Sequence, residues 1–258
     1  MTGRWIDNHD ANGDVRLFCF AHAGGGAAFF HPWRKELAPE IVVTPVVLPG
    51  REARWREPPY VRMEALLAPL CDAVRASVDR PFALFGHSMG AALAYEVAIR
   101  LATAACGPPL CLLVSGRRAP HLPPRRPPIH DLPSDRFLAE LKRLNGTTES
   151  LFRDPALLQA LLPGLRADFE LSETYSPRRA ASLPVPISAF VGNRDPLVDA
   201  DEMRQWGDLT TGEFGLRVFD GDHFYLAGGR PTLLDAIRQD VVRAMRLTGG
   251  KERQWKPA

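Results

Sequence analysis

The sequence predicts an α/β fold, in which a mainly parallel β-sheet is covered on both faces by helices. Two observations predict it. Short runs rich in β-branched and aromatic residues alternate with longer segments whose apolar residues recur at helical spacing. A serine flanked by glycines also stands where one predicted strand passes directly into a predicted helix. Strands that alternate with helices along a chain usually pair in parallel, with the helices on the two faces of the sheet.

The predicted strands are six short apolar segments, at residues 15–20, 41–48, 82–85, 110–115, 187–191 and 216–219. In the second of these, Pro45 removes one hydrogen-bond donor, which favours an edge of the sheet or a bulge. Helical spacing is found at 63–78, at 91–98 and from 231 to 245, where a proline lies in the first turn.

The alternation stops between residues 117 and 186. A run rich in proline and arginine at 117–128 cannot form regular structure, and helical spacing then returns without strands at 135–144 and 154–171. An insertion between two strands at this point lies at the carboxyl edge of the sheet. Because a loop this long in a compact domain is usually functional, we expect residues 117–186 to form a helical lid rather than a mere connection.

Size and composition limit the class of protein. A chain of 258 residues, 45% hydrophobic and 24% charged, can bury one large core, so we expect a single domain over residues 1–258 that contains the insertion. A net charge of +2 without a run of like charges gives no reason to expect a nucleic-acid partner. We find no signal peptide and no apolar stretch of membrane-spanning length. We therefore expect a cytoplasmic monomer that does not bind membranes.

Residues 86–90 (GHSMG) have the sequence of a nucleophile elbow, a sharp turn that presents a serine hydroxyl between a strand and a helix. Such a serine is held in a strained backbone conformation and needs small residues two positions before and after it, which Gly86 and Gly90 provide. We therefore expect Ser88 to be a nucleophile. The N–H of Met89, at the start of the following helix, faces the oxygen that gains negative charge in acyl transfer.

A serine nucleophile needs a base within hydrogen-bond reach, and the base needs an acid to orient it. Among the seven histidines, His223 is the best candidate base, because it lies between the last predicted strand and the last helix. His87 is adjacent to the nucleophile along the chain, which points its ring away from the hydroxyl. Asp195 is the candidate acid, because it follows the predicted strand at 187–191.

Other acidic residues near this position have simpler interpretations. Asp199 and Asp201 lie just beyond the candidate acid, and we interpret them as negative charges at the start of a helix. Asp222 precedes the candidate base and is expected to shape its turn. We therefore keep a single acid in the proposed set.

The order Ser88, Asp195, His223 along the chain is that of the α/β-hydrolase fold. A second oxyanion donor is expected from the loop after the first strand, where glycines leave N–H groups free and let the backbone approach a ligand closely. We expect the N–H of Ala23 to be this second donor, together with that of Met89. A phosphate-binding role for these glycines is the alternative, but neither common glycine-rich phosphate-binding pattern is present.

The four cysteines are too far apart in the sequence for paired C-x-x-C ligands: Cys19, Cys71, Cys106 and Cys111. We expect them to be buried free thiols rather than disulfides. Neither a metal ion nor a cofactor is expected.

At this point the chain resembles the type II thioesterases, the free-standing editing hydrolases that accompany modular polyketide synthases and nonribosomal peptide synthetases. Five stretches carry the resemblance, at 20–25, 86–90, 115–120, 165–169 with 173–175, and 221–226. The stretches inside the insertion are the most specific, since general esterases share the elbow but not these. Ala21 is a departure from the family pattern, because the family commonly has proline at this position. The missing proline would loosen the oxyanion loop without removing a reacting group.

The resemblance implies a substrate, an acyl group stalled on the phosphopantetheine thiol of an acyl or peptidyl carrier protein, which would be a transient partner. In that reaction Ser88 attacks the thioester carbonyl, and His223 later activates water to release the acid. A thiolate leaves readily, so selectivity has to come from the acyl pocket and from carrier docking. Four arginines near the predicted lid either meet an acidic carrier or a phosphate, or form a solvated loop: Arg117, Arg118, Arg125 and Arg126.

Two other functions stay open. A medium-chain fatty acyl-carrier thioesterase or a carboxylesterase would use the same scaffold, and its chain-length or oxygen-ester preference would separate it. A non-catalytic acyl- or carrier-binding protein is the alternative outside enzymes, and the complete catalytic set argues against it.

Overall fold

The computed structural model of the chain describes residues 5–8, 12–144, 154–177, 181–228 and 230–249. Within these residues, six strands form one sheet in the order β2-β1-β3-β4-β5-β6, and each neighbouring pair is parallel. The strands are β1 (Val15–Phe20), β2 (Ile41–Pro45), β3 (Phe82–His87), β4 (Leu112–Ser115), β5 (Ile187–Gly192) and β6 (Phe214–Phe219). The parallel α/β sheet that the sequence predicts is therefore confirmed.

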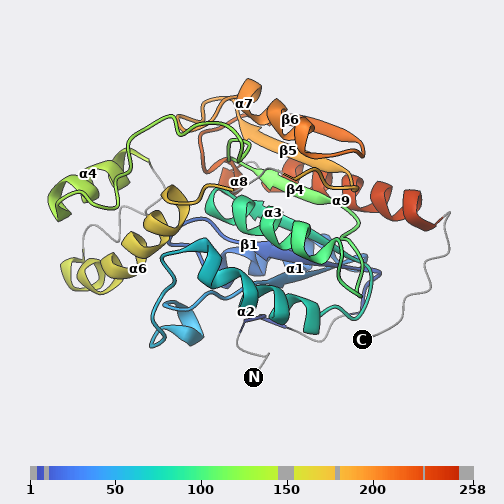
Figure 1. Cartoon of the computed structure of the whole chain (residues 1–258), viewed down its shortest axis with the longest axis horizontal. Helices are drawn as coiled ribbons and strands as arrows, with labels where there is room; N and C mark the ends of the chain where they lie inside the picture. The colour runs from blue at the N-terminus through green and yellow to red at the C-terminus, as the bar shows by residue number, and fades with distance from the viewer. Residues whose placement is uncertain (1–4, 9–11, 145–153, 178–180, 229, 250–258) are drawn as a thin grey trace.

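Helices cover both faces of the sheet (Figure 1). Their bounds are α1 (His31–Leu37), α2 (Met63–Ala76), α3 (Met89–Leu101), α4 (Ser134–Arg143), α6 (Pro155–Glu173), α7 (Ala200–Arg204), α8 (Tyr225–Gly228) and α9 (Arg230–Gly249). Buried side chains of α2, α3 and α7 pack against one face, and those of α1, α8 and α9 against the other. The helices α4 and α6 lie together at one end of the sheet (Figure 1).

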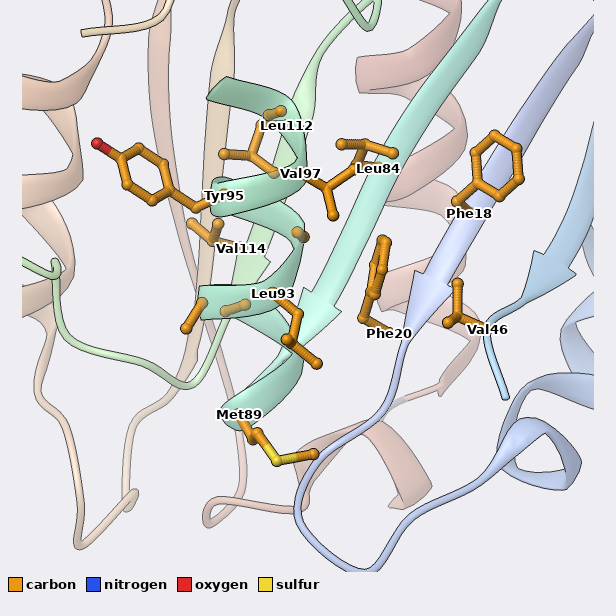
Figure 2. Close-up of a cluster of buried hydrophobic side chains, with 14 of the residues drawn as sticks. Phe18, Phe20, Val46, Leu84, Met89, Leu93, Tyr95, Val97, Leu112 and Val114 are labelled. Carbon is orange, nitrogen blue, oxygen red and sulfur yellow. The ribbon is translucent and has the colours of Figure 1, made fainter. Parts of the chain in front are cut away.

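The side chains of β1 pack against helices on both faces of the sheet. Phe18 and Phe20 point into the layer that contains α3, whereas Leu17 and Cys19 point into the opposite layer. All four side chains are buried, as expected for a strand that has helices on both sides. Figure 2 shows Phe18 and Phe20 facing the same cluster as Leu93 of α3. Each such apolar side chain contributes about 1.5–3 kcal/mol when it is fully buried.

The second strand is shorter than the segment 41–48 that the sequence predicts. It ends at Pro45, and β2 lies at the edge of the sheet, as the missing donor favours. Beyond the proline the backbone N–H of Val46 still donates to the Cys19 carbonyl at 2.9 Å. Val46 also forms an antiparallel bridge with Ile6. The apolar pattern continues past Pro45 because these residues are buried, although they no longer belong to the parallel strand.

Candidate active site

The turn between β3 and α3 holds Ser88 in an unusual backbone conformation, with φ 54° and ψ −116°. Few residues other than glycine adopt a positive φ, and such strain persists only where the surroundings enforce it. The Ser88 N–H donates to the Ser115 carbonyl of β4 at 2.8 Å, and the Ala91 N–H donates to the Ser88 carbonyl at 3.0 Å. Strand β4 and the first turn of α3 therefore lock the turn that the GHSMG sequence predicts.

The two glycines of the turn are required by close backbone contacts. A Cβ atom on Gly86 would lie far inside contact distance of the Gly90 carbonyl. A Cβ atom on Gly90 would clash in the same way with the carbonyl of Phe20 in β1. Both obstacles are backbone atoms, so a side-chain rotation cannot relieve them. These contacts are the physical reason for glycine at both positions.

The candidate base and acid meet at the ends of the last two strands. His223 follows β6, Asp195 follows β5, and the distance between His223 Nδ1 and Asp195 Oδ2 is 2.7 Å. The other carboxylate oxygen of Asp195 accepts from the Leu197 N–H at 2.8 Å. Both side chains are buried, with exposed fractions of 3% for the imidazole and 0% for the carboxylate. A carboxylate at Nδ1 favours the tautomer that leaves Nε2 as an acceptor.

Ser88, His223 and Ala23 line one cavity of about 70 Å³. The structure thus brings together residues that are far apart in the sequence, as the proposed catalytic set requires. Among the hydrogen bonds of the described residues, none joins the Ser88 hydroxyl to His223. Such bonds are often long in a free enzyme and tighten when substrate binds. Ser88 also lines a second cavity, of about 750 Å³.

Two further histidines lie close to the candidate base. The ring centroid of His87 lies 4.8 Å from that of His223, and the centroid of His22 lies 5.8 Å from that of His87. Burial, together with the nearby His223, lowers the pKa of His22 to about 4, and burial lowers the pKa of His87 well below its usual value. Both rings are therefore neutral at pH 7 and add no positive charge beside His223.

The ring of His87 belongs to a buried polar network beside Ser88. Its Nδ1 lies 2.9 Å from Ser115 Oγ, which in turn lies 2.6 Å from the hydroxyl of Tyr225. This network ties β3 to β4 and to α8. Nδ1 of the ring is therefore engaged by Ser115, and no hydrogen bond among the described residues joins the ring to the Ser88 hydroxyl.

The two predicted oxyanion donors occupy suitable places. Met89 is the first residue of α3, and an N–H in the first turn of a helix has no partner within the helix. Ala23 stands in the loop after β1 and lines the same cavity as Ser88. The loop is closed by a hydrogen bond from the Gly25 N–H to the His22 carbonyl, at 2.9 Å.

Two charged residues hold this loop, and the sequence reasoning missed both roles. Asp168 Oδ2 accepts from the Gly24 N–H at 2.7 Å, and Arg51 Nη1 donates to the Gly25 carbonyl at 2.8 Å. Asp168 and Arg51 also form an ion pair with each other. The only signal for Asp168 was its place in one of the stretches that carry the family resemblance, and no pattern in the sequence pointed to Arg51.

The insertion between β4 and β5 holds α4 and α6, which confirms helices where the sequence predicts them at 135–144 and 154–171. Five of its residues line the small cavity beside Ser88: Leu141, Leu144, Leu165, Phe169 and Ser172. Helix α6 begins at an N-cap, where Asp154 accepts from two backbone N–H groups. Parts of the predicted lid, residues 145–153 and 178–180, lie outside the described residues.

The arginines of the proline-rich run are engaged within the fold. Arg117 donates to Ser172 of α6, and Arg126 donates to the carbonyl of Pro196 at 2.6 Å. Arg118 and Arg125 both pair with Glu202 of α7, at 2.9 and 3.2 Å. Each of these side chains therefore has a partner on another part of the chain, although Arg125 and Arg126 are exposed to solvent at the same time.

The thiols agree with the interpretation of the sequence. All four cysteines are free, and three of them are buried: Cys19, Cys71 and Cys111. Cys106 is half-buried. In the part of the chain that the structure describes, no helix combines the length and the apolar character needed to cross a membrane.

The chain is similar to known proteins over most of its length. Residues 15–241 match the family model described as the thioesterase domain. The chain is 42% identical over 228 residues to the thioesterase PikA5 of Streptomyces venezuelae, covering 87% of this chain and 81% of that protein. It is 39% identical over 246 residues to the probable cadicidin biosynthesis thioesterase of Streptomyces griseus, covering 95% of this chain but only 66% of that protein.

A solved structure is similar over almost its whole length. The type II thioesterase BorB from the borrelidin biosynthetic cluster is 40% identical in sequence, with a TM-score of 0.84. The match covers 92% of this chain and 97% of that chain. The likeness therefore extends over most of both chains rather than over one segment.

Proposed function

This chain belongs to the thioesterase family, and we propose that it works as a type II thioesterase, hydrolysing acyl thioesters on the phosphopantetheine arm of carrier proteins. The proposed role is the removal of aberrant acyl units in polyketide or nonribosomal peptide biosynthesis. The observation that carries it is the buried pair of His223 and Asp195 beside the cavity that Ser88 lines. The names of the relatives support the choice of substrate.

In the proposed first half-reaction the Ser88 oxygen attacks the thioester carbonyl while His223 Nε2 takes the hydroxyl proton. The carbonyl oxygen becomes negatively charged and accepts hydrogen bonds from the N–H groups of Ala23 and Met89. The carbon–sulfur bond then breaks, and the sulfur leaves as a thiol with the proton that His223 returns. The acyl group remains on Ser88 as an ester.

In the second half-reaction His223 takes a proton from water, and the resulting hydroxide attacks the acyl ester. The tetrahedral intermediate uses the same two N–H groups, and its collapse returns a proton to the Ser88 oxygen and releases the carboxylic acid. The Asp195 carboxylate stabilises the imidazolium in both halves, because it accepts from Nδ1. The protein needs no cofactor of its own in this scheme, since the phosphopantetheine belongs to the substrate.

The larger cavity supports a substrate with a long arm. Its volume of about 750 Å³ is within the usual range of ligand pockets, and it extends from Ser88 towards the proline-rich run. Arg125 lines it and is half exposed, so it can meet an acidic surface of an acyl or peptidyl carrier protein. The proposal includes a transient carrier complex, a monomeric enzyme, and α4 and α6 acting as a lid.

The direct test loads carrier proteins with acetyl, propionyl and longer acyl groups and follows their release by mass spectrometry. We expect the wild-type protein to release them at least a thousandfold faster than the Ser88→Ala variant, which lacks the nucleophile but keeps the cavity. Equal rates for the two proteins would disprove the proposal. A fluorophosphonate probe should label the wild type and leave the variant unlabelled.

The same experiment distinguishes the alternatives. A strong preference for medium-chain acyl carriers would favour a fatty acyl-carrier thioesterase, and faster cleavage of oxygen esters would favour a carboxylesterase. Tight binding of acylated carriers without turnover or labelling would favour the binding protein. Short acyl groups released from carriers of biosynthetic synthases are the result that supports editing.

A further inference from the structure

We infer that Asp168 of α6 is a positioning residue for the oxyanion loop, residues 22–26, so that the inserted segment builds part of the active site besides covering it. The inference rests on the proposed function, because it assigns a role within the same reaction. Asp168 does not touch the reacting atoms. It acts through the backbone of the loop that carries Ala23.

The contacts of Asp168 span two parts of the chain that are distant in sequence. Its side chain is buried, 144 residues away from the Gly24 N–H that it accepts from at 2.7 Å. Its other oxygen pairs with Arg51, whose Nη1 donates to the Gly25 carbonyl at 2.8 Å. One carboxylate and one guanidinium therefore hold a donor and an acceptor of the loop at the same time.

These contacts set the orientation of the Ala23 N–H through the peptide units that lie between them. Gly24 has a φ of +77° and no side chain, so nothing within the residue itself restricts its backbone. Fixing Gly24 and Gly25 directs the Gly25 N–H to the His22 carbonyl, at 2.9 Å. That carbonyl and the Ala23 N–H belong to one rigid peptide unit. The orientation of the proposed oxyanion donor thus depends on Asp168.

Burial of the carboxylate strengthens this link. An ionised carboxylate away from water is costly unless it is paired and hydrogen-bonded, and Asp168 finds both compensations in the loop and Arg51. Any displacement of α6 leaves Gly24 without this acceptor. The position of the inserted helix and the geometry of the oxyanion loop are therefore coupled.

The test compares Asp168→Asn with Glu170→Gln, a matched variant on the same helix. Glu170 also joins α6 to the main fold, through an exposed ion pair with Arg62, but no hydrogen bond or ion pair among the described residues joins its side chain to the loop. We expect Asp168→Asn to lower kcat for acyl release from loaded carriers by 10- to 100-fold, with KM within twofold, because oxyanion donors act mainly in the transition state. Glu170→Gln should change neither constant by more than twofold.

A second measurement separates positioning from loss of structure. The Ser88 oxygen attacks an alkyl trifluoromethyl ketone reversibly, and its proton passes to His223. The resulting hemiketal places a negatively charged oxygen between the same N–H groups. The affinity of the ketone for Asp168→Asn should fall by the factor seen in kcat/KM. Arg51→Lys keeps the positive charge but lacks the planar guanidinium that bridges Asp168 and Gly25. We expect it to lower kcat and the affinity for the ketone in the same way. It replaces Asp168→Asn in the test if that variant does not fold.

Three results would overturn the inference: an effect of Asp168→Asn no larger than that of Glu170→Gln, a rise in KM alone, or unchanged affinity for the ketone. If the wild-type protein releases no acyl groups from carriers, the proposed function fails instead. The rate of fluorophosphonate labelling at Ser88 then still tests Asp168, because that reaction also develops a charged oxygen in the loop.

Discussion

Three histidines lie within one cluster, and their surroundings decide which of them can act as a base. His223 has the Asp195 carboxylate on Nδ1, which stabilises a positive charge on its ring. His87 instead has the neutral hydroxyl of Ser115 at Nδ1. His22 carries a buried Nδ1 that has no hydrogen-bond partner among the described residues. Only the first of these environments suits a ring that must accept and return a proton.

The low pKa of His22 predicts a specific dependence of stability on pH. Its pKa is about 4 in the folded protein and near 6.5 in the unfolded chain, so the unfolded chain binds more protons between these values. Stability is therefore lost as the pH falls below 6.5. With about 1.4 kcal/mol per pKa unit, the loss between pH 7 and pH 4.5 is about 2 kcal/mol.

The measurement is urea unfolding of the wild type and of His22→Gln at several pH values. We expect the wild type to lose about 2 kcal/mol more than the variant over that interval, because glutamine does not titrate. Parallel pH profiles for the two proteins would show that His22 titrates normally in the folded state.

At the scale of elements, the approach of α3 to β1 and β3 sets the position of Ser88. Larger side chains of α3 pack against the strands, among them Leu93 and Val97. The closest approach is at the start of the helix, where Gly90 lies against the Phe20 carbonyl of β1 and Gly86 lies against the Gly90 carbonyl. A side chain at Gly90 would therefore move the start of α3, and Ser88 with it, away from β1.

Gly90→Ala tests this close approach. Its added methyl group would meet the carbonyl of Phe20, a backbone atom, so α3 and β1 must separate. We expect a loss of about 3 kcal/mol or more in the free energy of unfolding and a much slower reaction of Ser88 with a fluorophosphonate. Gly215→Ala in β6 is the control, because no atom lies within 4 Å of its added Cβ. Equal stabilities for the two variants would contradict the packing argument.

At the scale of the whole molecule, the insertion is fastened to the α/β sheet and its helices by polar contacts at several separate points. Glu202 of α7 holds Arg118 and Arg125 of the proline-rich run, Arg62 pairs with α6, and Arg51 pairs with α6 near the oxyanion loop. The larger cavity lies between the run and α6, where Arg118 and Arg125 line it on one side and Phe169 and Ser172 on the other. The cavity proposed for the substrate is thus made by the arrangement of segments rather than by any one of them.

Glu202→Gln tests one of these attachments. Glutamine still caps α7 by accepting from the Asp199 N–H, but it loses the charge that pairs with Arg118 and Arg125. We expect faster tryptic cleavage within residues 117–128 and a change of less than about 1 kcal/mol in the free energy of unfolding, because the pairs are partly exposed.

Asp72→Asn provides the control, because Asp72 forms an exposed ion pair with Arg75 within α2, away from the insertion. It should leave both the cleavage rate and the stability unchanged. If Glu202→Gln is cleaved no faster than this control, the proline-rich run is held by its other contacts.

The sequence by itself determined the features that local patterns encode. The alternation of strands and helices predicts the sheet, GHSMG predicts the turn at Ser88, and the order of Ser88, Asp195 and His223 predicts which residues meet at one end of it. These features are predictable because hydrophobic periodicity and the steric needs of a turn act over a few neighbouring residues. The end of β2 at Pro45 shows the limit, because burial continues where strand pairing stops.

Only the tertiary structure decided which charged side chains hold the site together. Asp168 contacts Gly24 across 144 residues, and Arg51 joins the same cluster from the segment after β2. Likewise Arg118 and Arg125 find Glu202 on α7. A long charged side chain can reach many partners, and its partner is set by how packed elements come together. No spacing along the chain records that arrangement.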